Sequence, residues 1–146
     1  METVRTIAAA RGRGPCAVTW GVFDGVHRGH AALLGALREE ARRAGGRAAA
    51  IAFDWHPHRT LGRPVPAFLC DPERTRPRLL AGQGVDLLIL QPFDVALAGT
   101  DPEAFLDAVV LDLSARAVVL GEGARFGRGA EGTADLLRAR AEERGF

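Results

Sequence analysis

Short apolar runs alternate along the chain with longer segments in which apolar residues recur every three to four positions. Runs of this kind, bounded by glycine, proline or polar residues, are typical of strands covered on both faces, as in a parallel sheet. The spacing in the longer segments is that of helices with one apolar face. The predicted strands are residues 16–20, 48–53, 85–90 and 117–120.

Signals for helix starts accompany this periodicity. The Asp-Pro-Glu sequences at 71–73 and 101–103 place a capping residue before a proline at the first helical position. Thr100 and Glu103 also have the spacing of a capping box, and Gly45-Gly46 ends the first helical pattern. The predicted helices are residues 32–41, 71 to 82 or 84 with a kink at Pro77, 100–113 and 133–144.

Two segments lack either pattern. Residues 54–69 contain Pro57, Pro64 and Pro66 and are expected to form a long loop without regular structure. Residues 121–129 are rich in glycine and follow the last predicted strand. Long loops within a compact fold are usually functional, so both segments are candidates for binding a ligand.

Alternating strands and helices predict an α/β fold, a parallel sheet with right-handed crossovers and helices on both faces. A chain of 146 residues is long enough to bury one compact core. Ligands in such folds bind at the carboxyl ends of the strands. Because the sequence ends on a predicted helix, it leaves open whether the sheet lacks its last strand.

Composition narrows the class of protein. The 19 basic and 18 acidic residues give a net charge of +1, which provides no overall field for nucleic acid or an anionic membrane. Cys16 and Cys70 lie outside any metal or redox spacing and fit a reducing compartment. No apolar stretch has the length of a secretory or membrane-spanning segment, so we expect a cytoplasmic protein.

The strongest candidate for chemistry is Gly-Val-Phe-Asp-Gly-Val-His-Arg-Gly-His at 21–30, where the first strand gives way to the first helix. A helix N-terminus presents free N–H groups and partial positive charge, and glycines let a phosphate approach the backbone. His27 and His30 are three residues apart and share one helix face. Fixed donors of this kind lower the barrier to phosphoryl transfer by stabilising its negative charge.

On this motif and three further segments, the sequence resembles the FMN adenylyltransferase domain of bacterial bifunctional riboflavin kinase/FMN adenylyltransferase, or FAD synthetase. The resemblance implies a Rossmann-like nucleotidylyltransferase fold and Mg²⁺-dependent transfer of AMP from ATP to FMN, giving FAD and pyrophosphate. It also implies that residues 1–146 form a single nucleotidylyltransferase domain without the riboflavin kinase domain. The matching segments are 19–30, 53–57, Phe93 with 99–105, and 120–127 with 132–133.

The resemblance assigns roles to individual residues. His27 and His30 would be the catalytic contacts to the ATP phosphates, and His56, Pro57 and Phe126 would lie by the flavin or the transferred phosphate. A guanidinium at Arg125, in the glycine-rich loop, can reach a phosphate. No metal ligands are expected, because Mg²⁺ is held largely by the substrate phosphates and water. The remaining residues expected to line the ATP site are Gly21, Phe23, Asp24, Gly25 and Gly29.

The sequence departs from the family pattern at three places. Gly123 and Ala124 stand where the family usually has Asn or Asp followed by an aromatic residue. Trp55 stands where the family usually has proline, and its ring either stacks on a planar ligand, fills the pocket or packs under the long loop. The family's Ser-Ser-Thr-x-x-Arg motif has no counterpart before Phe146, as expected of either a truncated sequence or a shortened homologue.

These departures leave three functions open. The first is FMN adenylyltransferase activity, and the second is transfer of a nucleotide to another phosphate-bearing acceptor. The third is a catalytically weak module that binds nucleotide or flavin.

Overall fold

The computed structural model describes residues 1–146 and contains a sheet of five strands in the order β1-β4-β3-β2-β5. Each neighbouring pair is parallel, as the sequence pattern predicts. The strands are β1 (Glu2–Val4), β2 (Cys16–Gly21), β3 (Arg47–Phe53), β4 (Leu87–Gln91) and β5 (Ala115–Val118).

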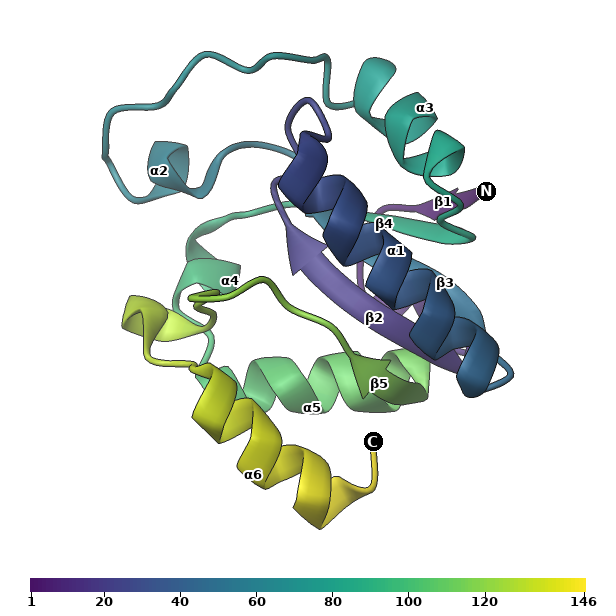
Figure 1. Cartoon of the computed structure of the whole chain (residues 1–146). Coiled ribbons are helices and arrows are strands. Elements are labelled where there is room, and N and C mark those ends of the chain that lie inside the picture. Colours follow the sequence, from purple (N-terminus) through teal and green to yellow (C-terminus); the bar gives the residue numbers. More distant parts are fainter.

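Helices connect the strands and cover the sheet, which lies between α1 and α5 in Figure 1. The short helical turns η1 (Ala8–Ala10) and η2 (Arg128–Ala130) lie outside the main helices. The helices are α1 (Arg28–Arg43), α2 (Pro57–Thr60), α3 (Thr75–Gly82), α4 (Val95–Ala98), α5 (Pro102–Leu113) and α6 (Ala134–Arg144).

Each face of the sheet has its own hydrophobic core, because successive side chains of a strand point to opposite faces. Ala17 of β2 and Ala50 of β3 face α1 and α3, with Leu34, Leu37 and Leu80. On the opposite face, α5 packs against the other residues of the same strands. The buried side chains there include Val18, Trp20, Ala49, Ile51, Phe105, Leu106 and Val109.

The order of the strands reverses at β2. The helices α1 and α3, on one face, carry the chain from β2 to β3 and then to β4. From β4 the chain returns through α5, on the other face, to β5 on the far side of β2. In open parallel sheets, ligands bind outside the carboxyl ends of the strands at such a reversal. The loops after β2 and β5 therefore flank the expected binding crevice.

Five small elements were not predicted from the sequence, namely β1, η1, α2, α4 and η2. The predicted bounds of some helices and strands were also displaced, and β5 spans Ala115–Val118 instead of residues 117–120. The strand β1 was not predicted, and the expected irregular loop contains the four-residue helix α2. The helix α1 begins at Arg28, four residues earlier than its apolar spacing indicates. Asp71 does accept hydrogen bonds from the N–H groups of Glu73 and Arg74, but the turn that it caps precedes α3, which begins at Thr75.

The expected capping box of α5 is wrong. Its N-cap is Asp101, whose carboxylate accepts a hydrogen bond from the Glu103 N–H at 2.9 Å. The hydroxyl of Thr100 instead donates to the carbonyl of Ala96 in α4, also at 2.9 Å. Asp101 prevails because its side chain precedes Pro102, which occupies the first helical position.

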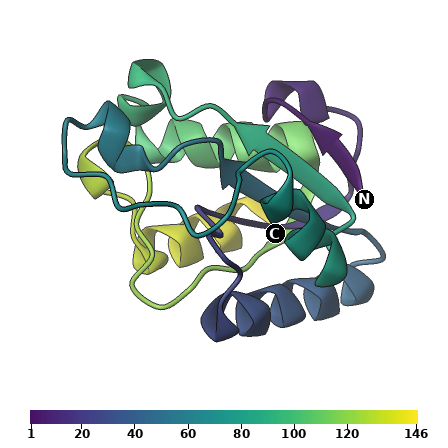
Figure 2. The same ribbon diagram turned by 90° about the horizontal axis from the view of Figure 1, so that it is seen from above.

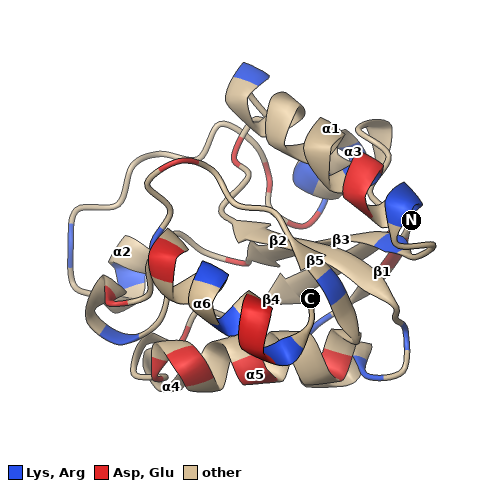
Figure 3. Ribbon diagram, turned by 60° about the horizontal axis from the view of Figure 1, so that its bottom comes forward, with Lys and Arg blue, Asp and Glu red and all other residues tan.

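The helix α6 agrees with the helix predicted over residues 133–144, and Thr133 is its N-cap. Acidic and basic residues both lie along it in Figure 3. Arg140 and Arg144 form ion pairs with Glu103 and Asp107, which lie on α5. These pairs attach α6 to α5 and so hold the end of the glycine-rich loop that precedes it.

None of the helices combines the length and the apolar character needed to cross a membrane.

Candidate functional site

The segment Gly21–His30, called here the histidine loop, leads from β2 into α1. His27 is the N-cap of α1, and its Nδ1 accepts a hydrogen bond from the His30 N–H at 3.3 Å. The two imidazole rings are stacked, with centroids 3.7 Å apart and 18° between their planes. The structure therefore brings together the two histidines that the sequence predicts to act as a pair.

Glycine permits this stacking at one position in particular. A Cβ on Gly29 would lie 3.2 Å from both Cε1 and Nδ1 of His27, closer than side chains normally approach. Phe23, which is buried, packs beside the pair with its ring centroid 5.1 Å from that of His30. Gly29 thus leaves room for the His27 ring, and Phe23 packs against the His30 ring.

The histidine loop also holds two residues in a conformation that costs energy. Phe23 and Val26 have φ values of 52° and 43°, in the left-handed region that non-glycine residues rarely adopt. Such strain costs on the order of 1–3 kcal/mol for each residue and gathers at functional sites. The surrounding contacts therefore maintain a shape that the loop would not take by itself.

His30 is the more enclosed member of the pair. Burial lowers the pKa of its imidazole, the neighbouring His27 lowers it further, and Asp24 partly opposes both effects. Its Nδ1 is buried and has no hydrogen-bond partner. His30 is therefore mostly neutral at neutral pH, and an anion bound beside it would favour its protonated form.

Asp24 fastens a distant segment to the histidine loop. Its carboxylate accepts hydrogen bonds from the N–H groups of Leu69 and Cys70, at 2.8 and 3.0 Å, and from the Cys70 thiol at 3.3 Å. Burial acts to raise the pKa of Asp24, but these hydrogen bonds lower it below its ordinary value. The carboxylate expected to line the ATP site is thus occupied in holding the chain.

Residues 54–70, called here the strap, run from the end of β3 through α2 and back to α3, as Figure 2 shows from above. Asp54 anchors the first end, because its carboxylate accepts from the N–H groups of Trp55 and Phe93 at 2.7 and 3.1 Å. Asp24 anchors the second end. The strap is therefore fixed at both ends across the carboxyl edge of the sheet.

His56, at the start of the strap, caps α2. Its Nδ1 accepts a hydrogen bond from the His58 N–H at 3.2 Å. Burial and the nearby His58 lower the pKa of His56, while Asp24 acts to raise it. His56 lies beside Pro57, which lines the cavity described next, but is itself not one of the lining residues.

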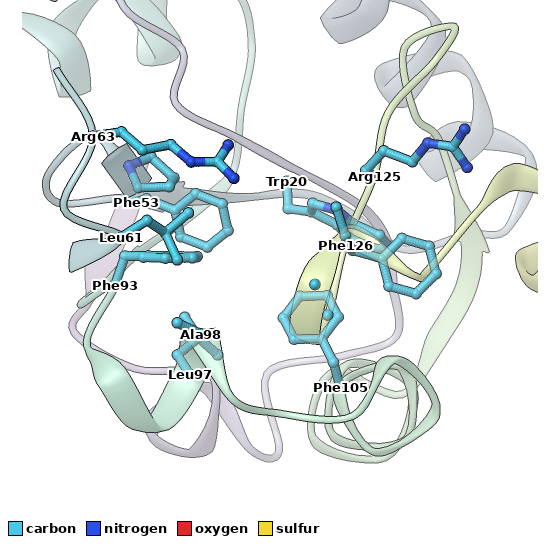
Figure 4. A pocket seen from close by; sticks show the side chains of 14 residues that line it. Trp20, Phe53, Leu61, Arg63, Phe93, Leu97, Ala98, Phe105, Arg125 and Phe126 are labelled. Atoms are coloured by element: carbon cyan, nitrogen blue, oxygen red, sulfur yellow. The ribbon is translucent and has the colours of Figure 1, made fainter. Parts of the chain in front are cut away.

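An apolar cavity of about 260 Å³ opens on the α5 face of the sheet, at the carboxyl ends of β2 and β3. Of the residues predicted to bind a ligand, Pro57, Arg125 and Phe126 line it. Figure 4 shows its aromatic side chains and the two arginines at its rim. The other lining residues include Trp20, Phe53, Leu61, Arg63, Phe93, Leu97 and Phe105.

The aromatic side chains form two groups that face each other across the cavity (Figure 4). Trp20 meets Phe105 and Phe126 edge to face, at centroid distances of 5.2 and 5.3 Å. Phe53 and Phe93 meet on the other side, 5.0 Å apart and at 73°. Walls of this kind suit a flat aromatic ligand, which gains both burial and ring contacts.

The rim of the cavity is basic. Arg63 comes from the strap and Arg125 from the glycine-rich loop, and the two side chains stand on opposite sides in Figure 4. Neither guanidinium takes part in an ion pair or a side-chain hydrogen bond within the chain. Both are therefore available to a phosphate at the mouth of the cavity.

Trp55 does not occupy the cavity, so the expectation that it fills the pocket is wrong. Trp55 is 47% exposed, and the Arg59 guanidinium lies 4.6 Å from its ring centroid. Phe68 packs beside it at 6.1 Å. The ring lies within the strap, which agrees with the packing alternative.

Sequence reasoning gave no site role to most of the aromatic lining. Trp20, Phe53 and Phe93 each lie within two residues of the end of a strand, and that common position is a signal that could have identified them. Phe105 and Arg63 carry no such signal, because a helix and a loop of the strap bring them to the cavity.

Comparison with known proteins bears on this arrangement. The profile of the FAD synthetase family matches residues 10–146. The chain belongs to the FAD synthetase family. The bifunctional riboflavin kinase/FMN adenylyltransferase of Escherichia coli K12 is 35% identical over 132 residues, which cover 90% of this chain and 42% of that protein. The FAD synthetase of Listeria monocytogenes is 31% identical over 134 residues, covering 91% of this chain and 54% of that protein.

The fold of this FAD synthetase family member also matches a solved structure. A crystal structure described as a macrolide-efflux protein from Streptococcus pneumoniae superposes with a TM-score of 0.81 and 25% sequence identity. The match covers 95% of this chain and 47% of that one. The chain thus spans about half the length, or less, of these relatives, and its fold is the α/β, Rossmann-like fold that its sequence predicts.

Proposed function

We propose that the chain transfers AMP from MgATP to FMN, giving FAD and pyrophosphate. The observation that carries this proposal is that the histidine loop and the aromatic cavity share the end of β2, where Trp20 lines the cavity and Gly21 begins the histidine loop. A phosphate site and a site for a flat aromatic ring are thereby joined, as the transfer to a flavin phosphate requires.

In this reaction the protein positions the two substrates and stabilises charge, and it forms no covalent bond with either of them. A phosphate oxygen of FMN attacks the α-phosphorus of ATP, the new phosphorus–oxygen bond forms, and the bond to the pyrophosphate leaving group breaks. His27, His30 and the N–H groups at the start of α1 would face the charge that develops on the phosphate oxygens. Gly21 and Gly25 would let those phosphates approach the backbone closely.

The cavity would hold the flavin ring. Phe53 and Phe93 on one side and Phe126 on the other would contact its faces and edges, with Pro57 closing the strap side. Arg63 or Arg125 at the rim would bind the FMN phosphate and direct it toward the α-phosphorus.

Magnesium would enter as part of the MgATP substrate. No group of three or more His, Cys, Asp or Glu side chains gathers as a metal site, and the Asp24 carboxylate is occupied by the strap. The metal would therefore be held by the nucleotide phosphates and water, as Mg²⁺ commonly is.

The direct test incubates the purified protein with FMN, ATP and Mg²⁺ and separates the flavins by chromatography. We expect FAD and pyrophosphate to appear in equal amounts, and omission of Mg²⁺ to stop the reaction. Binding of both substrates without any FAD would contradict the transfer and favour a nucleotide- or flavin-binding module.

A second acceptor is favoured by one observation in the glycine-rich loop. Gly123 has φ of 72°, and a Cβ built there meets no atom within 4 Å, so the space that an Asn or Asp side chain takes in the family is open. Other phosphate monoesters with a planar ring would then compete with FMN. Product formation from such a compound, at a higher kcat/KM than from FMN, would establish this alternative.

A further inference from the structure

Arg76 is the single arginine of the chain with a fully buried side chain. It lies in the first turn of α3, and its guanidinium donates to two backbone carbonyls. Nη1 donates to the carbonyl of Val22 at 2.8 Å, and Nη2 donates to that of Asp54 at 3.4 Å. Its Nε is buried without a partner. The charged side chain of Arg76 therefore connects two segments of backbone through hydrogen bonds.

The two carbonyls belong to the first residues beyond the ends of β2 and β3. Up to that point the sheet holds the strands together, with Gly21 opposite Ala52 as the last pair. Past it, Val22 leads to His27 and Asp54 leads to His56 and the strap. Arg76 thus spans the position where the two halves of the site separate from the sheet.

Only an arginine can make this connection. Its planar fork presents several N–H groups in fixed directions, whereas lysine offers one flexible ammonium. The burial is unfavourable for the charge and lowers the pKa of Arg76, although Asp24, Asp54 and Asp71 nearby act in the opposite direction. An apolar residue of similar size would avoid the cost of a buried charge that lacks a carboxylate partner.

We infer that Arg76 is a positioning residue, which fixes the distance between the histidine loop and the strap. This inference rests on the proposed AMP transfer, in which ATP is bound by the first segment and FMN by the second. Misplacing bound reactants by about 1 Å costs about a hundredfold in rate, even when each is still bound. Loss of Arg76 therefore acts on kcat and leaves the separate affinities in place.

The test compares Arg76→Met, Arg76→Lys and the control Arg78→Met, which removes an exposed arginine from the same helix. We expect Arg76→Met to lower kcat about a hundredfold. The dissociation constants of ATP, by calorimetry, and of FMN, by flavin fluorescence, should stay within about threefold of wild type. Arg76→Lys should recover about tenfold of the lost kcat, because one carbonyl regains a donor and the charge is kept. Arg78→Met should match wild type.

A second readout needs no turnover. Amide hydrogen exchange at residues 22–27 and 54–56 should accelerate together in Arg76→Met, and not in Arg78→Met, in the protein without ligands. If Arg76→Met does not fold, as judged by its thermal transition, Arg76→Lys carries both measurements.

The outcomes separate this inference from the proposed function. A wild-type protein that makes no FAD overturns the transfer, and the exchange rates then decide whether Arg76 joins the two segments. A loss that falls on KM with kcat unchanged would overturn the positioning role. So would exchange that accelerates in one segment alone, or in neither.

Discussion

The histidine loop and the aromatic cavity share the end of β2, but the residues of the loop are close in sequence and those of the cavity are far apart in sequence. The histidine loop is one continuous segment, Gly21–His30, in which a helix start stacks two imidazoles. The cavity takes side chains from strand ends, the strap, α4, α5 and the glycine-rich loop. Local spacing dictates the first geometry and the packing of the whole fold dictates the second. Changes in the loop should therefore alter phosphate chemistry alone, and changes in the cavity should alter acceptor binding alone.

The largest expected effect comes from removing the enclosed histidine. His30→Ala should lower kcat for FAD formation at least about a hundredfold, because it removes a fixed donor to the transferring phosphate. FMN binding, measured by flavin fluorescence, should be unchanged. Arg43→Ala at the exposed end of α1 is the control for folding. Unchanged turnover in a folded His30→Ala protein would show that the pair does not serve the reaction.

The next effect separates the shape of the histidine pair from stability. Gly29→Ala places a Cβ 3.2 Å from two atoms of the His27 ring, and ATP affinity should fall about tenfold, by about 1.4 kcal/mol. Gly35→Ala, in the same helix, meets no atom within 4 Å and is the matched control. Thermal unfolding should show Gly35→Ala more stable by up to about 1 kcal/mol with unchanged ATP affinity, since alanine is the better helix former. Equal ATP affinities in the two variants would refute the steric role of Gly29.

The corresponding change in the cavity is Phe126→Leu. Loss of ring contacts worth about 0.5–1.5 kcal/mol should weaken FMN binding about three- to tenfold. ATP affinity, measured by calorimetry, should stay as in wild type. Leu111→Ala removes an exposed apolar side chain of α5 and should change neither affinity. An equal loss for ATP and FMN would mean that the two regions do not act separately.

A smaller effect is expected from the protonation of His30, which lies in the histidine loop and not in the cavity. Since burial and His27 lower the pKa of His30 below its ordinary value of 6.5, ATP binding should take up a proton, and ATP affinity should rise a few-fold from about pH 8 to about pH 6. For the free protein the sign is opposite: the unfolded chain binds this proton more readily, so stability falls as pH drops below 6.5. Calorimetry in buffers of different ionisation enthalpy measures the uptake. Release of a proton, or equal uptake in His30→Gln, would be inconsistent with this assignment.

The smallest expected effect comes from adding a side chain in the glycine-rich loop. Gly123→Asn should improve FMN affinity about threefold, because asparagine tolerates the left-handed backbone and its amide has room. Gly123→Ala carries the backbone strain without the amide and should not improve it. If the two variants bind FMN equally well, the position does not contact the acceptor, and the alternative acceptor gains support.

The histidine loop could be predicted because its determinants are close in sequence. Three-residue spacing, a helix start and the intervening glycine suffice to place His27 against His30. The four longer strands were predictable for the same reason, since each contains a short run of mainly apolar residues, although β5 begins at Ala115, two residues before the predicted run. The strand β1 was not, because its three residues are partly exposed and owe their conformation to pairing with β4.

The cavity and Arg76 could not be predicted, because tertiary packing selects them. Arg74, Arg76 and Arg78 alternate along one segment, and nothing in the sequence marks the middle one as buried. Asp24 likewise reads as a ligand-facing carboxylate within the motif, and only the path of the strap shows its hydrogen bonds to Leu69 and Cys70.

The two aspartate anchors of the strap have an evolutionary consequence. Asp54 and Asp24 fasten its ends through backbone N–H groups, which every residue except proline can supply. Residues 55–68 between them can then change in length and composition while the ends stay in place. Acceptor preference can diverge in this stretch without selection having to rebuild the machinery that handles phosphate.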